Sequence, residues 1–109
     1  MSRDYYFHRE YAGCSVTVGV YLGTARAVEL LVDGHEVGRE QVAGHHEQVS
    51  VLHTTLPTDP PQPVSVEAAL PAAMRGDPEC TLVAAGERLP MPQRPMPHRA
   101  RPTEESWYH

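Results

Sequence analysis

The feature that most constrains the fold is a strict alternation of residue types between positions 14 and 22. Even positions in this stretch are apolar, whereas odd positions are mostly polar or small. Side chains of a β-strand point alternately to its two faces, so the pattern predicts a strand with one face in a core and the other toward solvent. Half-buried strands of this kind are typical of antiparallel sheets.

Similar patterns recur along the chain between short turn signals. We expect further strands at residues 4–11, 27–32, 35–42, 47–56, 64–70, 80–84 and 87–91. For 4–11 an N-terminal arm is the alternative. Short strands at this spacing predict a single small all-β domain, an antiparallel β-sandwich or open barrel of six to seven strands in a largely meander order.

Two hairpins are expected at Asp33-Gly34 and Ala85-Gly86. Asp-Gly between extended runs favours a tight two-residue turn, because both central residues need a positive φ. A two-residue turn predicts the facing pairs Val32–His35, Leu30–Val37 and Val28–Arg39, with Val28, Leu30, Val32 and Val37 on one face. Gly38 is a candidate β-bulge.

Three other segments have less regular patterns. In 47–56 we expect Val49, Val51 and His53 to face inward. The proline-rich residues 57–63 cannot form regular structure and are interpreted as a longer crossover. Residues 71–76 are predicted as one helical turn, and a helix over 66–75 is the rival to the strand at 64–70.

The length of 109 residues fits one domain, which we place at 1–89. Residues 90–109 form an extended, Pro/Arg-rich C-terminal tail, with five prolines in residues 90–102. The net charge of −5 argues against a nucleic-acid surface on the body, whereas residues 90–102 carry three arginines and no acid.

The chain lacks Lys, Asn and Ile, which indicates a GC-rich genome, such as that of a high-GC bacterium or phage. No apolar run approaches the roughly 18 residues that a membrane span needs. The N-terminus lacks the apolar core of a signal peptide. We therefore expect a protein that is cytoplasmic, or part of a particle assembled in the cytoplasm.

No catalytic motif frames the serines, acids or cysteines, so we expect a non-enzymatic protein without a cofactor. Seven histidines raise the alternative of a metal site, with His45, His46 and His8 as candidate ligands. However, no metal-ligand spacing supports it, and adjacent histidines of a strand point to opposite faces. Cys14 and Cys80 both fall on inward positions, where they are buried thiols or, alternatively, a disulfide.

The tail carries the most specific interaction signal. A pre-extended segment loses little entropy on binding, and arginine and aromatic side chains are typical binding anchors. The candidate partner-binding residues are Pro92, Arg94, Pro95, Arg99, Arg101, Trp107 and Tyr108.

Together these observations predict a protein–protein interaction module. It would be a structural or accessory subunit of a larger bacterial or viral assembly, docking on a protein partner or on further copies of itself through its tail. We expect no nucleic-acid or membrane partner. The alternative is a small-molecule or metal-binding β-domain that uses the histidines.

Overall fold

The computed structural model describes residues 3–72 and 75–94, and this part of the chain forms nine β-strands and no helix. The strands are β1 (Arg3–Tyr11), β2 (Cys14–Leu22), β3 (Arg26–Val32), β4 (His35–Val42), β5 (Gln48–Leu56), β6 (Gln62–Leu70), β7 (Glu79–Ala84), β8 (Glu87–Met91) and β9 (Gln93–Arg94). The predicted all-β class is confirmed, although nine strands form where six to seven were expected, and the aromatic N-terminal segment is a strand rather than an arm. Within the described ranges no helix is long and apolar enough to cross a membrane.

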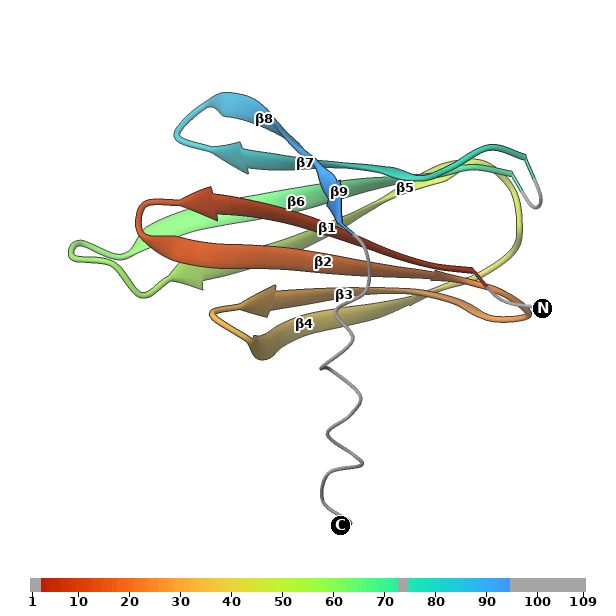
Figure 1. Ribbon diagram of the computed structural model, residues 1–109, viewed down its shortest axis with the longest axis horizontal. Helices are drawn as coiled ribbons and strands as arrows, with labels where there is room; N and C mark the ends of the chain where they lie inside the picture. The colour runs from red at the N-terminus through yellow and green to blue at the C-terminus, as the bar shows by residue number, and fades with distance from the viewer. Residues whose placement is uncertain (1–2, 73–74, 95–109) are drawn as a thin grey trace, which may run out of the picture.

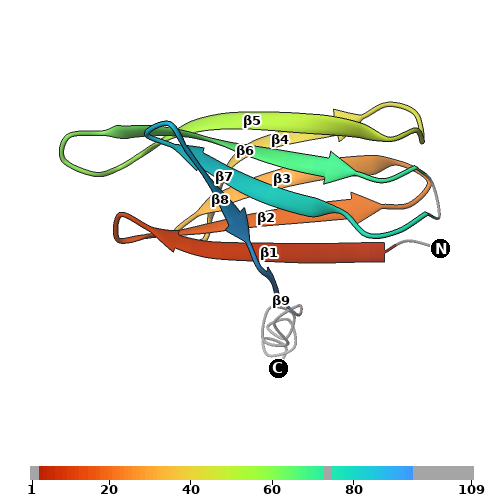
Figure 2. The same cartoon turned by 90° about the horizontal axis from the view of Figure 1, so that it is seen from above.

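The strands form two antiparallel sheets that pack face to face as a sandwich (Figures 1 and 2). One sheet has the order β4-β3-β2-β1-β9 and the other β5-β6-β7-β8. Apart from β9, both sheets are simple meanders, as predicted.

The chain passes between the sheets at two places. Residues 43–47 lead from β4 to β5, and Pro92 leads from β8 to β9. The interpretation of residues 57–63 as the crossover was therefore wrong. β5 and β6 are antiparallel neighbours that pair along their whole length, with Leu56 opposite Gln62, so the proline-rich residues between them only reverse the chain.

Both expected hairpin turns are present. Asp33 and Gly34 have φ values of 51° and 84°, and Ala85 and Gly86 have 50° and 78°. The backbone N–H of Asp33 also donates to the Ser15 carbonyl, and its carboxylate accepts from the Ser15 N–H. These bonds fix the turn against β2.

The register beyond the first hairpin differs from the prediction. Val32 does face His35, but Leu30 faces Gly38 and Val28 faces Glu40. The ladder shifts at a β-bulge around Val37, which is unpaired and 45% exposed. The predicted pairs Leu30–Val37 and Val28–Arg39 were wrong because one extra residue in β4 moves every later residue along by one.

The core lies between the two sheets and is built mainly from valine and leucine. The alternation in β2 is confirmed: Val16, Val18 and Val20 are fully buried. They pack with residues from both sheets, which include Phe7, Val28, Leu30, Val66, Leu70, Leu82 and Met91.

The inward face of β5 is opposite to the one predicted. Val49 and Val51 are 59% and 41% exposed, whereas Leu56 is fully buried. Facing Leu52 and Leu56 inward buries larger side chains than facing the valines inward. Ser50, a buried polar residue on that face, donates its hydroxyl to the Glu40 carboxylate at 2.6 Å, so its burial leaves no unpaired hydroxyl.

The segment after β6 contains a turn, in which the Arg75 N–H donates to the Ala72 carbonyl. β6 itself is a strand through Leu70, so the rival helix over 66–75 was wrong. The predicted helical turn at 71–76 falls partly on residues 73–74, which lie outside the described residues.

Candidate interaction surface

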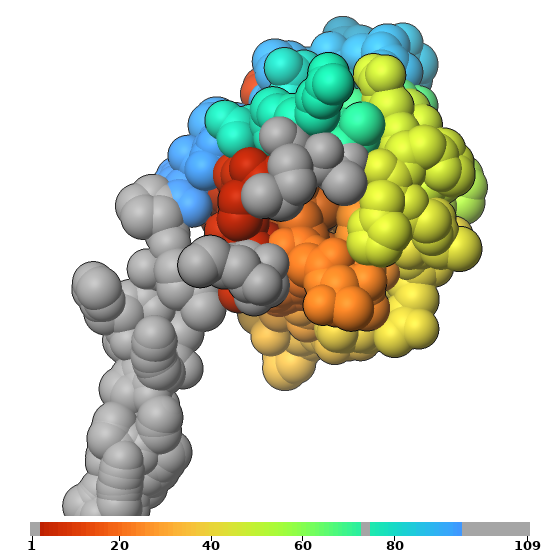
Figure 3. All heavy atoms as spheres, turned by 90° about the vertical axis from the view of Figure 1, so that its right-hand side faces the viewer, coloured from red at the N-terminus to blue at the C-terminus, as the bar shows by residue number. Residues whose placement is uncertain are grey.

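The tail starts from a fixed position on the sandwich. Strand pairing continues through Arg94, beyond the predicted end of the sandwich at residue 89. Met91 pairs with Cys80 and is buried in the core, and Gln93 and Arg94 pair with β1. The Pro92 carbonyl accepts from the His8 N–H, and the Arg9 guanidinium donates to the Pro90 carbonyl at 2.8 Å. Figure 3 shows the blue C-terminal residues beside red residues of the N-terminal strand.

Two of the predicted tail residues belong to this anchored part. Pro92 makes the passage between the sheets, and Arg94 lies in β9 opposite Tyr6 of β1. The remaining predicted partner-binding residues, Pro95, Arg99, Arg101, Trp107 and Tyr108, lie outside the described residues, and their role stays a prediction.

Arg94 belongs to a row of residues that crosses all five strands of its sheet. The register aligns Arg94 with Tyr6, Tyr6 with Gly19, Gly19 with Glu29, and Glu29 with Arg39. Residues directly opposite one another in an antiparallel pair have side chains on the same face. This face is the outer one, because the residues flanking Gly19 on β2, Val18 and Val20, point into the core.

Gly19 leaves a gap in this row that Tyr21 fills. A Cβ atom at position 19 would lie 2.7 Å from the Tyr21 hydroxyl oxygen, so the tyrosine ring can lie across the strand only because position 19 is glycine. The rings of Tyr6 and Tyr21 meet edge to face, with centroids 6.0 Å apart. Two aromatic rings therefore lie in contact over β1 and β2, within a row that ends in arginine on both sides.

Polar contacts hold Tyr21 in place. Its hydroxyl donates to Glu29 Oε1 at 2.6 Å, and Arg39 Nη1 lies 3.7 Å from the same oxygen. The Arg39 guanidinium also lies 5.9 Å from the centre of the Tyr21 ring, within cation–π distance. Burial, followed by the hydrogen bond to Glu29, raises the pKa of Tyr21 far above its usual value, so the phenol remains a neutral donor.

The sequence did not single out this row, which we call the Tyr6–Arg39 row. The outward Gly19, two residues before Tyr21, was the local signal that an aromatic ring covers the strand. The pairing of Glu29 with Arg39 had no local signal, because it depends on the bulge in β4.

The structure does not bring the three candidate metal ligands together. His8 lies on β1, where Nδ1 is 3.2 Å from Thr17 Oγ1 and Nε2 is 3.1 Å from Glu10 Oε2. His45 and His46 lie in the crossover after β4, which β3 and β2 separate from β1. In the described part of the chain, no group of three His, Cys, Asp or Glu side chains could hold a metal ion.

Cys14 and Cys80 are both buried free thiols, so the alternative of a disulfide is not realised. Burial raises the pKa of the Cys80 thiol to about 12 and is also the main cause of the raised pKa of Cys14. Thiolate is the nucleophilic form of cysteine, and a raised pKa disfavours it. Both cysteines therefore act as small apolar core residues.

We expect neither cysteine of the folded protein to react with an aromatic disulfide reagent at pH 8 on the timescale of minutes, whereas both react once guanidinium unfolds the chain. The reason is that burial excludes the reagent and suppresses the thiolate. Absorbance of the released thiol measures the rate. Rapid labelling of one cysteine in the folded protein would contradict the buried, protonated state.

Comparisons with protein-family models, with curated proteins and with solved structures find no match to this chain.

Proposed function

We propose that this protein is a non-enzymatic interaction module, acting as a structural or accessory subunit of a larger bacterial or viral assembly. It docks on a protein partner through the Pro/Arg-rich segment that begins after Arg94, together with the adjoining Tyr6–Arg39 row. The observation that carries the proposal is the alignment of Arg94 with Tyr6, because it starts the segment at one end of the Tyr6–Arg39 row.

The distribution of charge along the chain supports docking through this segment. The body carries most of the acidic residues, whereas residues 90–102 carry Arg94, Arg99 and Arg101 and no acid. The first part of the segment, residues 95–102, therefore carries only positive charge and suits an acidic groove on a partner. A guanidinium can bind a carboxylate through two parallel hydrogen bonds, and it can also stack on aromatic rings.

The anchoring of Pro90–Arg94 determines how the segment is best removed. A deletion that begins at Pro90 also removes Met91 from the core and β9 from its sheet, so it perturbs the body. A chain that ends at Arg94 keeps every described contact. The natural partner is first identified by what co-purifies with the protein from its native source.

We expect the chain ending at Arg94 to bind that partner at least about tenfold more weakly than the full chain, with an unchanged melting temperature. Binding calorimetry measures the affinity. Replacing Trp107 and Tyr108 by alanine should reproduce much of the loss, whereas His109→Ala is the matched control.

The surface of the body is tested separately with Tyr6→Ala. This variant should weaken binding, while Thr81→Ala, on the outer face of the other sheet, should not. Equal affinity of the full chain and the chain ending at Arg94 would overturn the proposal.

A further inference from the structure

The four edges of the two sheets are protected to very different degrees. Unpaired sheet edges are templates for another strand, and proteins block them with charges, prolines, bulges or short strands. β4 carries Glu36, Arg39, Glu40 and a bulge, β8 has five residues including Pro90, and β9 has only two residues. β5 has nine residues, Gln48–Leu56, with no Asp, Glu, Lys, Arg, Pro or Gly among them.

The far edge of β5 is not hydrogen-bonded to another strand in the part of the chain that the structure describes, although β4 of the other sheet lies close to it. β5 is the terminal strand of its sheet and pairs only with β6. Two side-chain hydrogen bonds link β5 to this neighbour and to the residue after it: Ser50 donates to Glu40 of β4, and Gln48 donates to the Ala43 carbonyl. No ladder of hydrogen bonds joins that edge to β4 in the described residues, so its backbone groups can pair with another strand.

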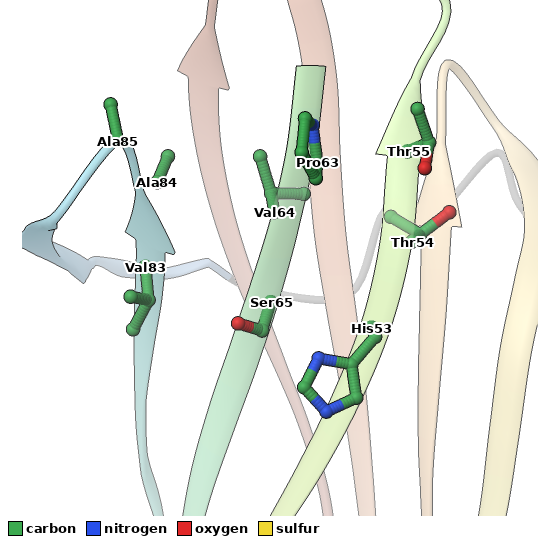
Figure 4. A pocket seen from close by; sticks show the side chains of 9 residues that line it. All are labelled: His53, Thr54, Thr55, Pro63, Val64, Ser65, Val83, Ala84 and Ala85. Carbon is green, nitrogen blue, oxygen red and sulfur yellow. The ribbon is translucent and has the colours of Figure 1, made fainter. Parts of the chain in front are cut away.

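The outer face of β5 is apolar beside this edge. Val49 and Val51 are two of the three exposed large hydrophobic residues in the described ranges. An open hollow of about 520 Å³ begins at His53, two residues after Val51, and Figure 4 shows His53, Ser65 and Val83 on its three neighbouring strands. An uncharged edge with apolar side chains next to a hollow is a surface that a second β-strand can cover.

We propose that β5 pairs antiparallel with β5 of a second copy of this chain about a twofold axis, which joins the two four-stranded sheets into one of eight strands. The register that pairs all nine residues places Leu52 opposite Leu52 of the partner subunit. Val51 then lies opposite His53 of the partner subunit, and Val49 opposite Thr55 of the partner subunit, at the rim of its hollow.

Self-pairing fits the charge distribution. Two copies of an acidic chain with net charge −5 repel each other over most of their surfaces. A twofold contact sets the same strand against itself, so a charged β5 would place like charges side by side. Of the two long edge strands, β4 carries charged residues and β5 carries none.

The competing occupant is the chain's own C-terminal segment. It begins at β9, on the far side of its sheet from β4. Pro95, Pro97 and Pro102 have no N–H to donate to a strand. The two occupants can be distinguished by their dependence on protein concentration. Pairing of β5 with a segment of its own chain does not depend on concentration, whereas pairing with a second copy does.

The test is amide hydrogen exchange and sedimentation of the full chain over increasing concentration, up to about 1 mM. We expect a species of twice the 12.1 kDa monomer mass and exchange protection of residues 48–56 that increases with concentration, with no change at residues 35–42. Val51→Lys should weaken the dimer about tenfold or more. Val37→Lys, at the similarly exposed valine of β4, is the matched control.

If Val51→Lys does not fold, His53→Glu on the same exposed face takes its place, and the melting temperature reports folding. The proposal is overturned if the chain is monomeric at every concentration, or if protection of 48–56 does not depend on concentration. An equal effect of Val37→Lys on the dimer would also overturn it. None of these measurements involves the tail's partner, so a failure here leaves the proposed function untouched.

Discussion

Val18→Asp is expected to unfold the protein. Val18 is fully buried in the middle of β2, where it lies opposite Phe7 on one side and Leu30 on the other. A carboxylate there meets no hydrogen-bond donor from these neighbours. Burying it costs several kcal/mol, in addition to about 1.5–3 kcal/mol of lost apolar burial. A domain of this size is stable by only about 5–15 kcal/mol.

The measurement is chemical denaturation followed by circular dichroism, with Thr17→Asp as the control. Thr17 is the next residue on the same strand, but its side chain points to the outer face, where its hydroxyl lies 3.2 Å from His8 Nδ1. A carboxylate at that position remains partly solvated, so we expect a loss below about 1 kcal/mol. Similar losses for the two variants would mean that both faces of β2 are covered, for instance in an assembly.

The architecture could be predicted from the sequence because most strands expose one face only. In β2, β6 and β7 the period of two marks the inward residues, and all three strands formed with the expected side inward. The turns at Asp33-Gly34 and Ala85-Gly86 were recognisable because few residue pairs tolerate two successive positive φ values. Local rules were sufficient wherever strand and turn signals agreed.

The errors arose where local signals compete. In β5 the valines and the leucines occupy opposite faces. The leucines face inward, and Ser50 on that face can be buried because it donates to Glu40, ten residues earlier in the chain. In β4 the bulge at Val37 changes every later pairing, although Gly38 indicated its approximate position. The number and position of the inter-sheet crossings also depend on packing, which periodicity does not encode.

The candidate surface was predictable only in part. Pro92 and Arg94 were selected for composition, and the structure gives them defined places on the sandwich. The Tyr6–Arg39 row could not be found from the sequence, because it joins residues of five strands through four separate registers. Such a row becomes visible only once the ladders are known.

Arg26→Ala is expected to lose about 2–4 kcal/mol of unfolding free energy. Arg26 is 3% exposed at the start of β3, yet in the described residues no carboxylate pairs with it. Its guanidinium donates instead to the carbonyls of Pro71, at 3.1 Å, and His46, at 3.0 Å. One carbonyl belongs to the crossover and the other follows β6, so Arg26 ties both sheets together at one end of the sandwich.

The control is Arg88→Ala. Arg88 makes a shorter contact, 2.7 Å to Glu67, but its side chain is 61% exposed. Exposed ion pairs contribute little, so we expect a loss below about 1 kcal/mol despite the better distance. Thermal or guanidinium denaturation compares the two variants. If both cost the same, burial of the Arg26 guanidinium does not determine its contribution.

Arg26→Met separates the hydrogen bonds from the packing. Two hydrogen bonds to a charged donor contribute about 1.5–3 kcal/mol each, but desolvation of the guanidinium costs several kcal/mol, and Arg26 Nε has no partner in the described residues. These opposing contributions nearly cancel, so most of the loss in Arg26→Ala comes from the cavity left by the long side chain. Methionine fills much of that volume without a charge, and we expect it to cost less than half as much as alanine. An equal loss for methionine and alanine would instead assign the stability to the two carbonyl bonds, and Arg26→Lys, which keeps the charge but not the paired geometry, would then be as destabilising as either.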